Sequence, residues 1–286
     1  MRFYLGVSVW GSARYLAEAV AKFNDKPLVA RFFLCFPYLS WSDKTLIRTL
    51  GLLRSCGQQV MFGLDSGGFV QQVKLKNRRK NFSLENYKGF LKDWGRQFEM
   101  CLSWDYGDER ECWRAFKTLI SSGFKVTPVW KLGDNPQLLI EYVKETPTEF
   151  VAVGGFGMLG RHNAKMSELF WALRDLIGKA KETRPEVKFH ALGCGFNTTL
   201  LKVWVPESAD STTPLQSQRY GLLVHIRNGK VVRTWYRQLR DEDLPSGVCL
   251  SEFKANSRLR SVVTAWCALK VTELINLSPT LPFALG

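Results

Sequence analysis

Three aspartates stand at the ends of predicted strands and could do chemistry together. Asp65 ends the strand 59–65, Asp105 follows the strand 99–104, and Asp210 ends the strand 207–210. A carboxylate can transfer a proton or act as a nucleophile. One Asp at such a place more often caps a helix or stabilises a loop. Three at equivalent places predict a shared site, because the strand ends of a barrel converge on one mouth.

Glycines follow three of the predicted strands directly. They are Gly67-Gly68, Gly154-Gly155, and Gly193 with Gly195. Without a Cβ, their backbone N–H groups can approach a flat ligand closely, although tight turns also require such glycines. We therefore predict a slot for a planar ligand. No phosphate-cradling G-x-G-x-x-G or Walker pattern accompanies them.

A run of basic residues follows the strand that carries Asp65. The run contains Lys74, Lys76, Arg78, Arg79 and Lys80. Most charge runs are solvated faces, but this one adjoins the predicted site in a chain with net charge +14. We predict that it contacts phosphates, and that Arg161 and Arg219, which follow other strand ends, join the same surface.

Metal and serine-hydrolase chemistry find little support. The seven cysteines are scattered singly, with no C-x2-C and no H-E-x-x-H, and G-x-S-x-G is absent. We expect the cysteines to be small buried residues in a reducing cytoplasm. His190 lies within a predicted strand, and we interpret it as a satisfied interior group rather than a base.

Strands alternate with amphipathic helices along most of the chain, which predicts a parallel α/β sheet. Seven strands are predicted, at 28–36, 59–65, 99–104, 124–130, 149–153, 187–192 and 207–210. Residues 221–226 can supply an eighth. The count favours an irregular (β/α)8 TIM-type barrel, and an open doubly wound sheet is the alternative.

The predicted helices span 84–98, with Ser83 as its cap, 109–121 and 163–181. Another runs through Lys144 with Asp134 or Asn135 as its cap, and a further one opens at Asn197 or Thr198. Residues 230–236 form a hairpin with 222–226 around Asn228-Gly229. A charged connector (237–260) and a closing amphipathic helix (261–277) follow. We predict one domain over 1–286, with its barrel core at about 28–227 and the hairpin, connector and helix in 228–286.

Composition describes a globular protein with a sizeable core. Apolar residues make up 45% of the 286 residues and charged residues 23%. The pI of about 9.6 favours a polyanion, nucleic acid first. No stretch is long and apolar enough to cross a membrane, and residues 1–10 are predicted to be a buried strand. We predict a cytoplasmic protein with no membrane partner; its oligomeric state is not predicted.

Several segments resemble the tRNA-guanine (queuine) transglycosylase superfamily. The segments are D-S-G-G-F at 65–69, V-G-G-F-G at 153–157, H-A-L-G-C-G at 190–195 and A-D-S-T-T-P at 209–214. Their order and approximate spacing match across roughly 28–223. The start F-Y-L-G-V-S, and the A-D-S segment with Arg219 downstream, are closer to the phage and bacterial branch that inserts 7-deazaguanines into DNA.

The resemblance implies a barrel that exchanges guanine for a 7-deazaguanine base, such as the 7-cyano form preQ0, without breaking the strand. Asp210 would attack the sugar C1′ and hold a covalent glycosyl intermediate, while Asp65 would transfer protons. Asp105 would accept the N1–H and amine of the purine, and Phe69 would stack on it. The implied base-binding set is Ser66, Gly67, Gly68, Phe69, Asp105, Gly154, Gly155, Phe156, Leu192 and Gly193.

Two departures bear on the substrate. The tRNA enzymes of the superfamily carry a C-x-C-x2-C zinc site beyond the nucleophile, whereas only Cys249 and Cys267 follow Asp210 here, so no zinc and no other cofactor is expected. Where those enzymes place Gln-Gly-Gly, this chain has Trp130-Lys131-Leu132-Gly133. Both departures favour DNA over tRNA. The alternatives are a tRNA-guanine transglycosylase and a non-catalytic barrel that binds nucleic acid.

Overall fold

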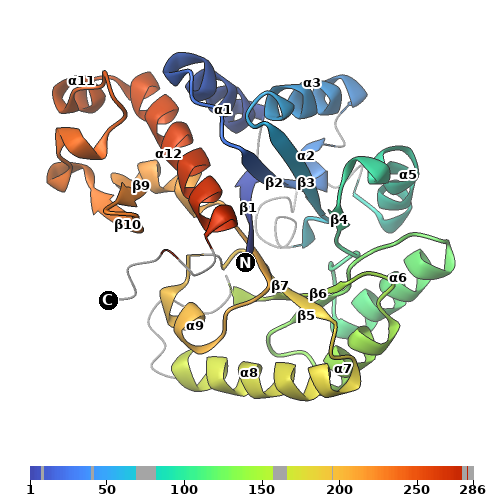
Figure 1. Cartoon of the computed structure of the whole chain (residues 1–286). Helices are drawn as coiled ribbons and strands as arrows, with labels where there is room; N and C mark the ends of the chain where they lie inside the picture. Colours follow the sequence, from blue (N-terminus) through green and yellow to red (C-terminus); the bar gives the residue numbers. More distant parts are fainter. Residues whose placement is uncertain are drawn as a thin grey trace. The chain divides into compact units, whose positions relative to one another are not determined.

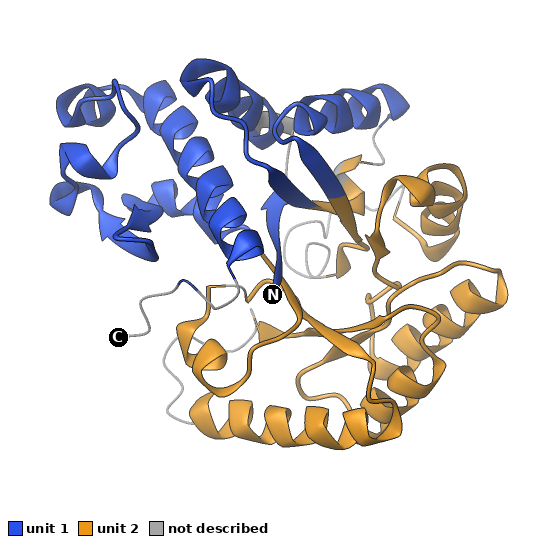
Figure 2. Ribbon diagram, viewed as in Figure 1, with its two compact units in different colours: residues 1–32, 42–61, 211–286 blue, residues 33–41, 62–210 orange. Residues whose placement is uncertain are grey.

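The computed structural model describes residues 1–7, 10–39, 42–68, 82–156, 166–194, 196–278 and 282. The chain divides into two compact units, coloured separately in Figure 2. Unit 1 comprises Met1–Phe32, Ser42–Met61 and Ser211–Gly286, and unit 2 comprises Phe33–Trp41 and Phe62–Asp210. The single domain predicted for 1–286 stays a prediction.

An eight-stranded sheet has the strand order β4-β3-β2-β1-β8-β7-β6-β5. The pairs β3–β4, β5–β6, β6–β7 and β7–β8 are parallel. An isolated parallel bridge between Leu102 and Thr127 joins the segments beside the two edge strands β4 and β5. The chain therefore has an α/β fold of the TIM-barrel type, as its alternation of strands and helices predicts.

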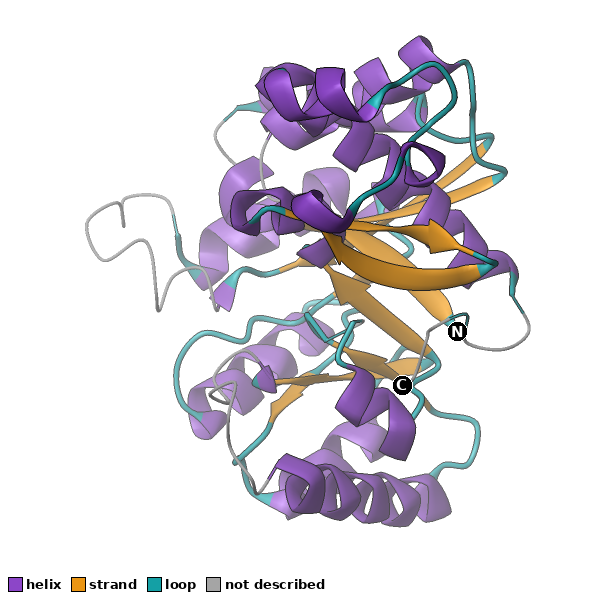
Figure 3. Cartoon of the chain, turned by 90° about the vertical axis from the view of Figure 1, so that its left-hand side faces the viewer, coloured by secondary structure: helices purple, strands orange, loops and turns teal. Residues whose placement is uncertain are grey.

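Unit 2 carries the strands and helices of the middle of the chain (Figure 1). Its elements are the end of β2 (Val29–Cys35), α2 (Phe36–Leu39), the end of β3 (Gln59–Asp65), α5 (Leu84–Trp94), η2 (Gly95–Gln97), β4 (Met100–Cys101), α6 (Glu109–Ser121), β5 (Val129–Lys131), α7 (Pro136–Glu145), β6 (Phe150–Gly154), α8 (Met166–Thr183), β7 (Lys188–Ala191), α9 (Thr198–Val203) and β8 (Ser208–Ser211). Helices α7 and α8 lie on the same side of β5, β6 and β7 (Figures 1 and 3).

Local sequence explains where these helices begin. Asp108 and Glu111 form a reciprocal capping box at the start of α6, with Glu111 N–H donating to the Asp108 carboxylate at 2.8 Å. Ser83 caps α5, and Asn135 caps α7 with Pro136 in its first turn. The predicted bounds of α6 are those observed. The strand predicted at 124–130 is shorter and later, because β5 covers only Val129–Lys131.

Unit 1 carries both ends of the chain. Its elements are β1 (Arg2–Val7), α1 (Trp10–Phe23), the start of β2, α3 (Asp43–Arg54), the start of β3, α10 (Thr213–Gln216), η4 (Ser217–Tyr220), β9 (Leu222–Arg227), β10 (Lys230–Trp235), η5 (Tyr236–Gln238), η6 (Asp241–Asp243), α11 (Leu250–Ala255) and α12 (Ser257–Leu277). Leu223, Phe253 and Val263 belong to a core cluster that joins the hairpin to α11 and α12.

The prediction of the eighth strand was wrong. Residues 221–226 do not join the large sheet, because β9 pairs antiparallel with β10 around the predicted Asn228-Gly229 turn. The eighth strand is β1, which is nearly all buried, as predicted for a strand at residues 1–10. A tight turn favours the local antiparallel partner, whereas a parallel partner requires a crossover connection.

Helix α12 also differs from its prediction. It begins at Ser257 and is buried around most of its circumference rather than on one face. It packs against α1 and β1 as well as against β9 and α11 (Figure 1). A helix with neighbours on several sides cannot keep a wide polar face, so the amphipathic interpretation was wrong. The connector predicted at 237–260 contains the short helix α11.

None of the helices in the described part of the chain combines the length and apolar character needed to cross a membrane.

Candidate active site

The three predicted carboxylates lie near one another in unit 2. Asp65 is the last residue of β3, Asp105 follows β4, and Asp210 lies in β8. The negative charges of Asp105 and Asp210 both act on Asp65. The same three carboxylates act on the buried thiol of Cys35, at the end of β2. Strands that are separated in the sequence therefore deliver the three acids to one place.

Asp65 holds a proton more strongly than an ordinary aspartate. Burial and the charge of Asp105 raise its pKa from 3.8 to about 8, and the charge of Asp210 adds to the effect. Hydrogen bonds from the Gly67 N–H, at 2.9 Å, and from the Cys35 thiol oppose the rise without cancelling it. At neutral pH, Asp65 is therefore predominantly protonated and can act as a proton donor.

Asp105 is fixed by the turn that follows Asp65. Its Oδ1 accepts hydrogen bonds from the Ser66 hydroxyl and from the Gly68 N–H, the latter at 3.0 Å. Burial raises its pKa, while these bonds and the charge of Lys131 act in the opposite direction. A Cβ on Gly68 would lie 2.4 Å from this oxygen, so only glycine fits. The Gly68 amide thus holds a carboxylate, which differs from the predicted slot for a flat ligand.

Asp210 is held by the turn after β7. Its Oδ1 accepts a hydrogen bond from the Gly193 N–H at 2.7 Å, and His190 Nε2 lies 3.3 Å from the same oxygen. His190 Nδ1 lies 2.9 Å from the Ser208 hydroxyl, which β8 places beside it. The His190 ring is fully buried and stacks on Phe33 at 5.1 Å between centroids.

His190 is an interior residue, and the structure also places it against Asp210. The sequence analysis did not connect these two residues. The register that sets His190 opposite Ser208, two residues before Asp210, exists only once β7 and β8 have paired. The available signal was the position of a histidine near the carboxyl end of a predicted strand.

Lys131 is a second residue whose place the sequence analysis did not predict. It ends β5, and its Nζ donates hydrogen bonds to the carbonyl oxygens of Gly107 at 2.9 Å and Asp105 at 3.4 Å. It also lies 3.4 Å from the Cys112 sulfur. The ammonium group therefore anchors the loop that carries Asp105 and places a positive charge beside its carboxylate.

The remaining predicted base-binding residues lie on neighbouring turns of unit 2. Gly154 ends β6 close to Leu192, since a Cβ on Gly154 would lie 3.3 Å from the Leu192 Cδ1. Gly155 has φ +88° and passes closely against the backbone of Leu132. Phe156 is buried, and its ring lies 6.3 Å from that of Phe170 in α8. Gly193 is exposed with φ +68°.

Several predicted nucleic-acid contacts cannot be placed beside these acids. Arg219 is exposed on η4 and belongs to unit 1. The others lie outside the described residues, as does the predicted stacking ring: Phe69, Lys74, Lys76, Arg78, Arg79, Lys80 and Arg161.

The described ranges contain no group of three or more His, Cys, Asp or Glu side chains arranged to hold a metal ion. All seven cysteines carry free thiols. Six are buried, as predicted, and Cys249 is exposed.

Comparisons with known proteins support the fold. No family model and no curated protein matches the chain. Among solved structures, it is similar to a putative fructose-1,6-biphosphate aldolase from Coccidioides immitis, with a TM-score of 0.50 and 12% identity over 97% of this chain and 91% of that chain. A fructose-bisphosphate aldolase from Campylobacter jejuni has a TM-score of 0.46 and 10% identity, over 96% of this chain and 90% of that chain. Tryptophan synthase subunit alpha from the same organism has a TM-score of 0.43 and 10% identity, over 76% of this chain and 90% of that chain.

Proposed function

We propose that this chain is a DNA-guanine transglycosylase that exchanges guanine in DNA for a 7-deazaguanine base such as preQ0. The observation that carries the proposal is the group of three carboxylates in unit 2, in which burial and like charge raise the pKa of Asp65. Base exchange needs both a nucleophile for the sugar and a proton donor for the departing base.

Asp210 is the proposed nucleophile. Its Oδ1 is fixed by the Gly193 N–H and lies 3.3 Å from His190 Nε2, and these two contacts hold the carboxylate in one orientation. Attack on C1′ forms an ester bond to the sugar and breaks the glycosidic bond to guanine. A second displacement at C1′ then releases Asp210 and restores the original configuration.

Asp65 is the proposed proton carrier. Because its pKa is raised to about 8, it enters the reaction protonated and gives its proton to the departing guanine. The resulting carboxylate takes the N9 proton of the incoming 7-deazaguanine, whose N9 then attacks C1′. One proton leaves Asp65 and one returns, so the enzyme ends the cycle in its starting state.

Asp105 is the proposed reader of the base. Its Oδ1 accepts hydrogen bonds from Ser66 and Gly68, which leaves the other oxygen to accept from the base in this proposal. A carboxylate accepts hydrogen bonds only, and a guanine-like ring offers two adjacent donors, N1–H and the exocyclic amine. Adenine lacks this donor pair, so the arrangement selects guanine and its 7-deaza analogues.

The test is base exchange with radiolabelled guanine. We expect the purified protein to incorporate label into DNA and not into tRNA, and denaturing gels to show a covalent protein–DNA band. Asp210→Asn should remove both the label and the band. Asp65→Asn should abolish turnover, and Asp93→Asn, an exposed change on α5, should leave it intact.

Label in tRNA alone would refute the DNA assignment, and no label in either nucleic acid would refute base exchange. A covalent band that persists in Asp210→Asn would refute the choice of nucleophile. His190→Gln, which keeps a polar group near the Nε2 position, should retain more turnover than His190→Ala at an unchanged KM, because the proposed role of His190 is to position Asp210.

A further inference from the structure

We infer that an exposed surface of unit 1 binds single-stranded DNA by stacking its bases on aromatic rings. The surface, termed the hairpin surface, consists of Arg219, Tyr220, Trp235 and Arg237. It lies outside the group of carboxylates, and its binding activity does not depend on base exchange. Only the choice of DNA as the partner rests on the proposed function.

The fold places these four residues on two segments that meet at the open end of the β9–β10 hairpin. Trp235 is paired with Leu222 in the hairpin register, and the Tyr236 N–H donates to the Gly221 carbonyl at 2.8 Å. The end of β10 therefore runs beside the residues that precede β9. Arg219 and Tyr220 lie on this neighbouring segment.

Both rings of the hairpin surface face solvent. Tyr220 is 60% exposed and Trp235 is 45% exposed, whereas the adjacent Leu223 and Thr234 are buried in the core of unit 1. The guanidinium carbon of Arg237 lies 5.8 Å from the centroid of the Trp235 ring. Exposed aromatic rings beside arginines are typical of proteins that stack unpaired bases, since every base has a π-face to offer.

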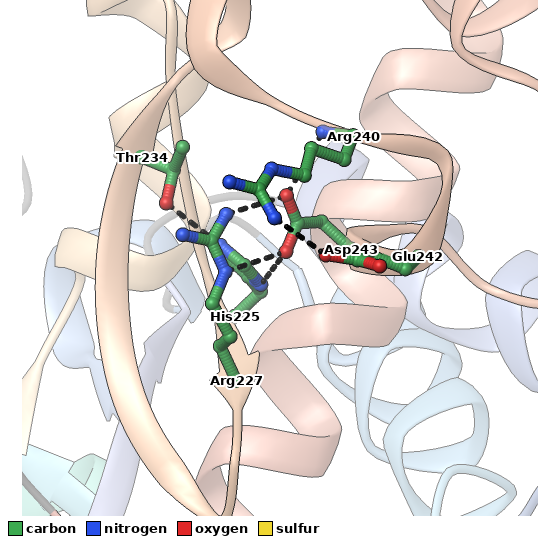
Figure 4. Close-up of polar contacts among 6 residues, drawn as sticks. All are labelled: His225, Arg227, Thr234, Arg240, Glu242 and Asp243. Carbon is green, nitrogen blue, oxygen red and sulfur yellow. Dashed lines mark hydrogen bonds and ion pairs between the residues drawn. The ribbon is translucent and has the colours of Figure 1, made fainter.

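The charge of the surrounding segment suits a polyanion. Residues 211–240 contain six Lys and Arg and no Asp or Glu. Two of the six are engaged by acids of the connector: Arg227 makes two hydrogen bonds to Asp243, and Arg240 pairs with Glu242 (Figure 4). Arg219 directly precedes Tyr220, Arg237 lies beside the Trp235 ring, and both arginines are exposed. They can neutralise phosphates on either side of the stacked bases.

A second exposed tryptophan shows which feature distinguishes the hairpin surface. Trp171 on α8 is 47% exposed and lies 5.0 Å from the Arg174 guanidinium, so its ring and cation resemble those of Trp235 and Arg237. Helix α8, however, carries three acidic and three basic residues. Exposure and a neighbouring arginine are common to both sites, and only the hairpin surface lies on a segment that contains no acidic residue.

The test is fluorescence anisotropy of the full-length protein with a labelled single-stranded oligothymidylate of about 12 nucleotides. We expect Trp235→Ala to raise its Kd about tenfold and Tyr220→Ala to act similarly, because stacking on one ring contributes about 1–3 kcal/mol per base. Trp171→Ala is the matched control and should leave Kd unchanged. Arg219→Gln with Arg237→Gln should reduce the salt dependence of binding.

Equal weakening by Trp171→Ala and Trp235→Ala, or no effect of Trp235→Ala, would overturn the inference. Tighter binding of RNA of matched sequence would overturn DNA as the partner. Equal loss of duplex binding in Trp235→Ala would overturn the stacking mode, because paired bases hide their faces. Circular dichroism of each variant shows whether the fold is kept. If DNA binding depends on Trp235 but the protein shows no base exchange, the proposed function is refuted and this inference is kept.

Discussion

Replacing Asp65 by asparagine should stabilise the protein and abolish the proposed exchange activity at the same time. The pKa of Asp65 is raised from 3.8 to about 8 by burial and by the neighbouring carboxylates. Each tenfold change in an ionisation constant corresponds to about 1.4 kcal/mol, so ionising Asp65 in the folded chain costs at least about 2 kcal/mol. The asparagine side chain does not ionise, so Asp65→Asn avoids this cost. Its amide oxygen can still accept the hydrogen bond from the Gly67 N–H.

The effect should appear in a defined pH window. In the unfolded chain Asp65 ionises near pH 4, whereas in the folded chain it keeps its proton until about pH 8. The free energy of unfolding of the native protein therefore falls across this window because of Asp65, and it falls no further above it. We expect Asp65→Asn and the native protein to differ little at pH 4. At pH 8 the variant should be more stable by at least about 2 kcal/mol.

Urea unfolding of both proteins at pH 4, 6 and 8 measures this difference. Asp93→Asn is the matched control, because it makes the same substitution on the exposed face of α5. It should shift stability by less than about 0.5 kcal/mol at every pH. The reasoning is wrong if Asp65→Asn gains no stability at pH 8, or if its gain is the same at pH 4 and pH 8.

Two further predictions concern other parts of the molecule. Gly68→Ala places a Cβ 2.4 Å from the Asp105 carboxylate, so it should destabilise the protein by about 1–3 kcal/mol in urea unfolding. Gly89→Ala on α5 is the control and should be neutral or stabilising, because a Cβ there meets nothing within 4 Å. Burial acts to raise the pKa of Asp243, but the hydrogen bonds from Arg227 and from the Arg240 N–H, together with nearby positive charge, outweigh burial, and the pKa is lowered (Figure 4). Asp243 therefore contributes stability above its ordinary pKa, and this stability is lost as the pH falls through its lowered value. Asp243→Asn should lower the free energy of unfolding by about 2–4 kcal/mol at pH 7. The variant should also lose less stability than the native protein when the pH is lowered.

Local features of the chain were predictable from local residues. The bounds of α6 follow from the Asp108–Glu111 capping box and its apolar spacing, and the hairpin follows from Asn228-Gly229. Both depend on interactions between residues a few positions apart, which the sequence displays directly. The eighth strand of the sheet and the surroundings of α12 depend on partners far away in the chain, and both predictions failed.

The sequence by itself determined which residue types could do chemistry, the alternation that builds the sheet, and the places of Asp65, Asp105 and Asp210 at strand ends. Only the tertiary structure decided that Gly68 and Gly193 would hold the carboxylates of Asp105 and Asp210. It also set Asp65 where burial and like charge keep it protonated. The physical reason is that a pKa and a carboxylate's hydrogen bonds depend on neighbours in space, and strand pairing alone brings those neighbours together.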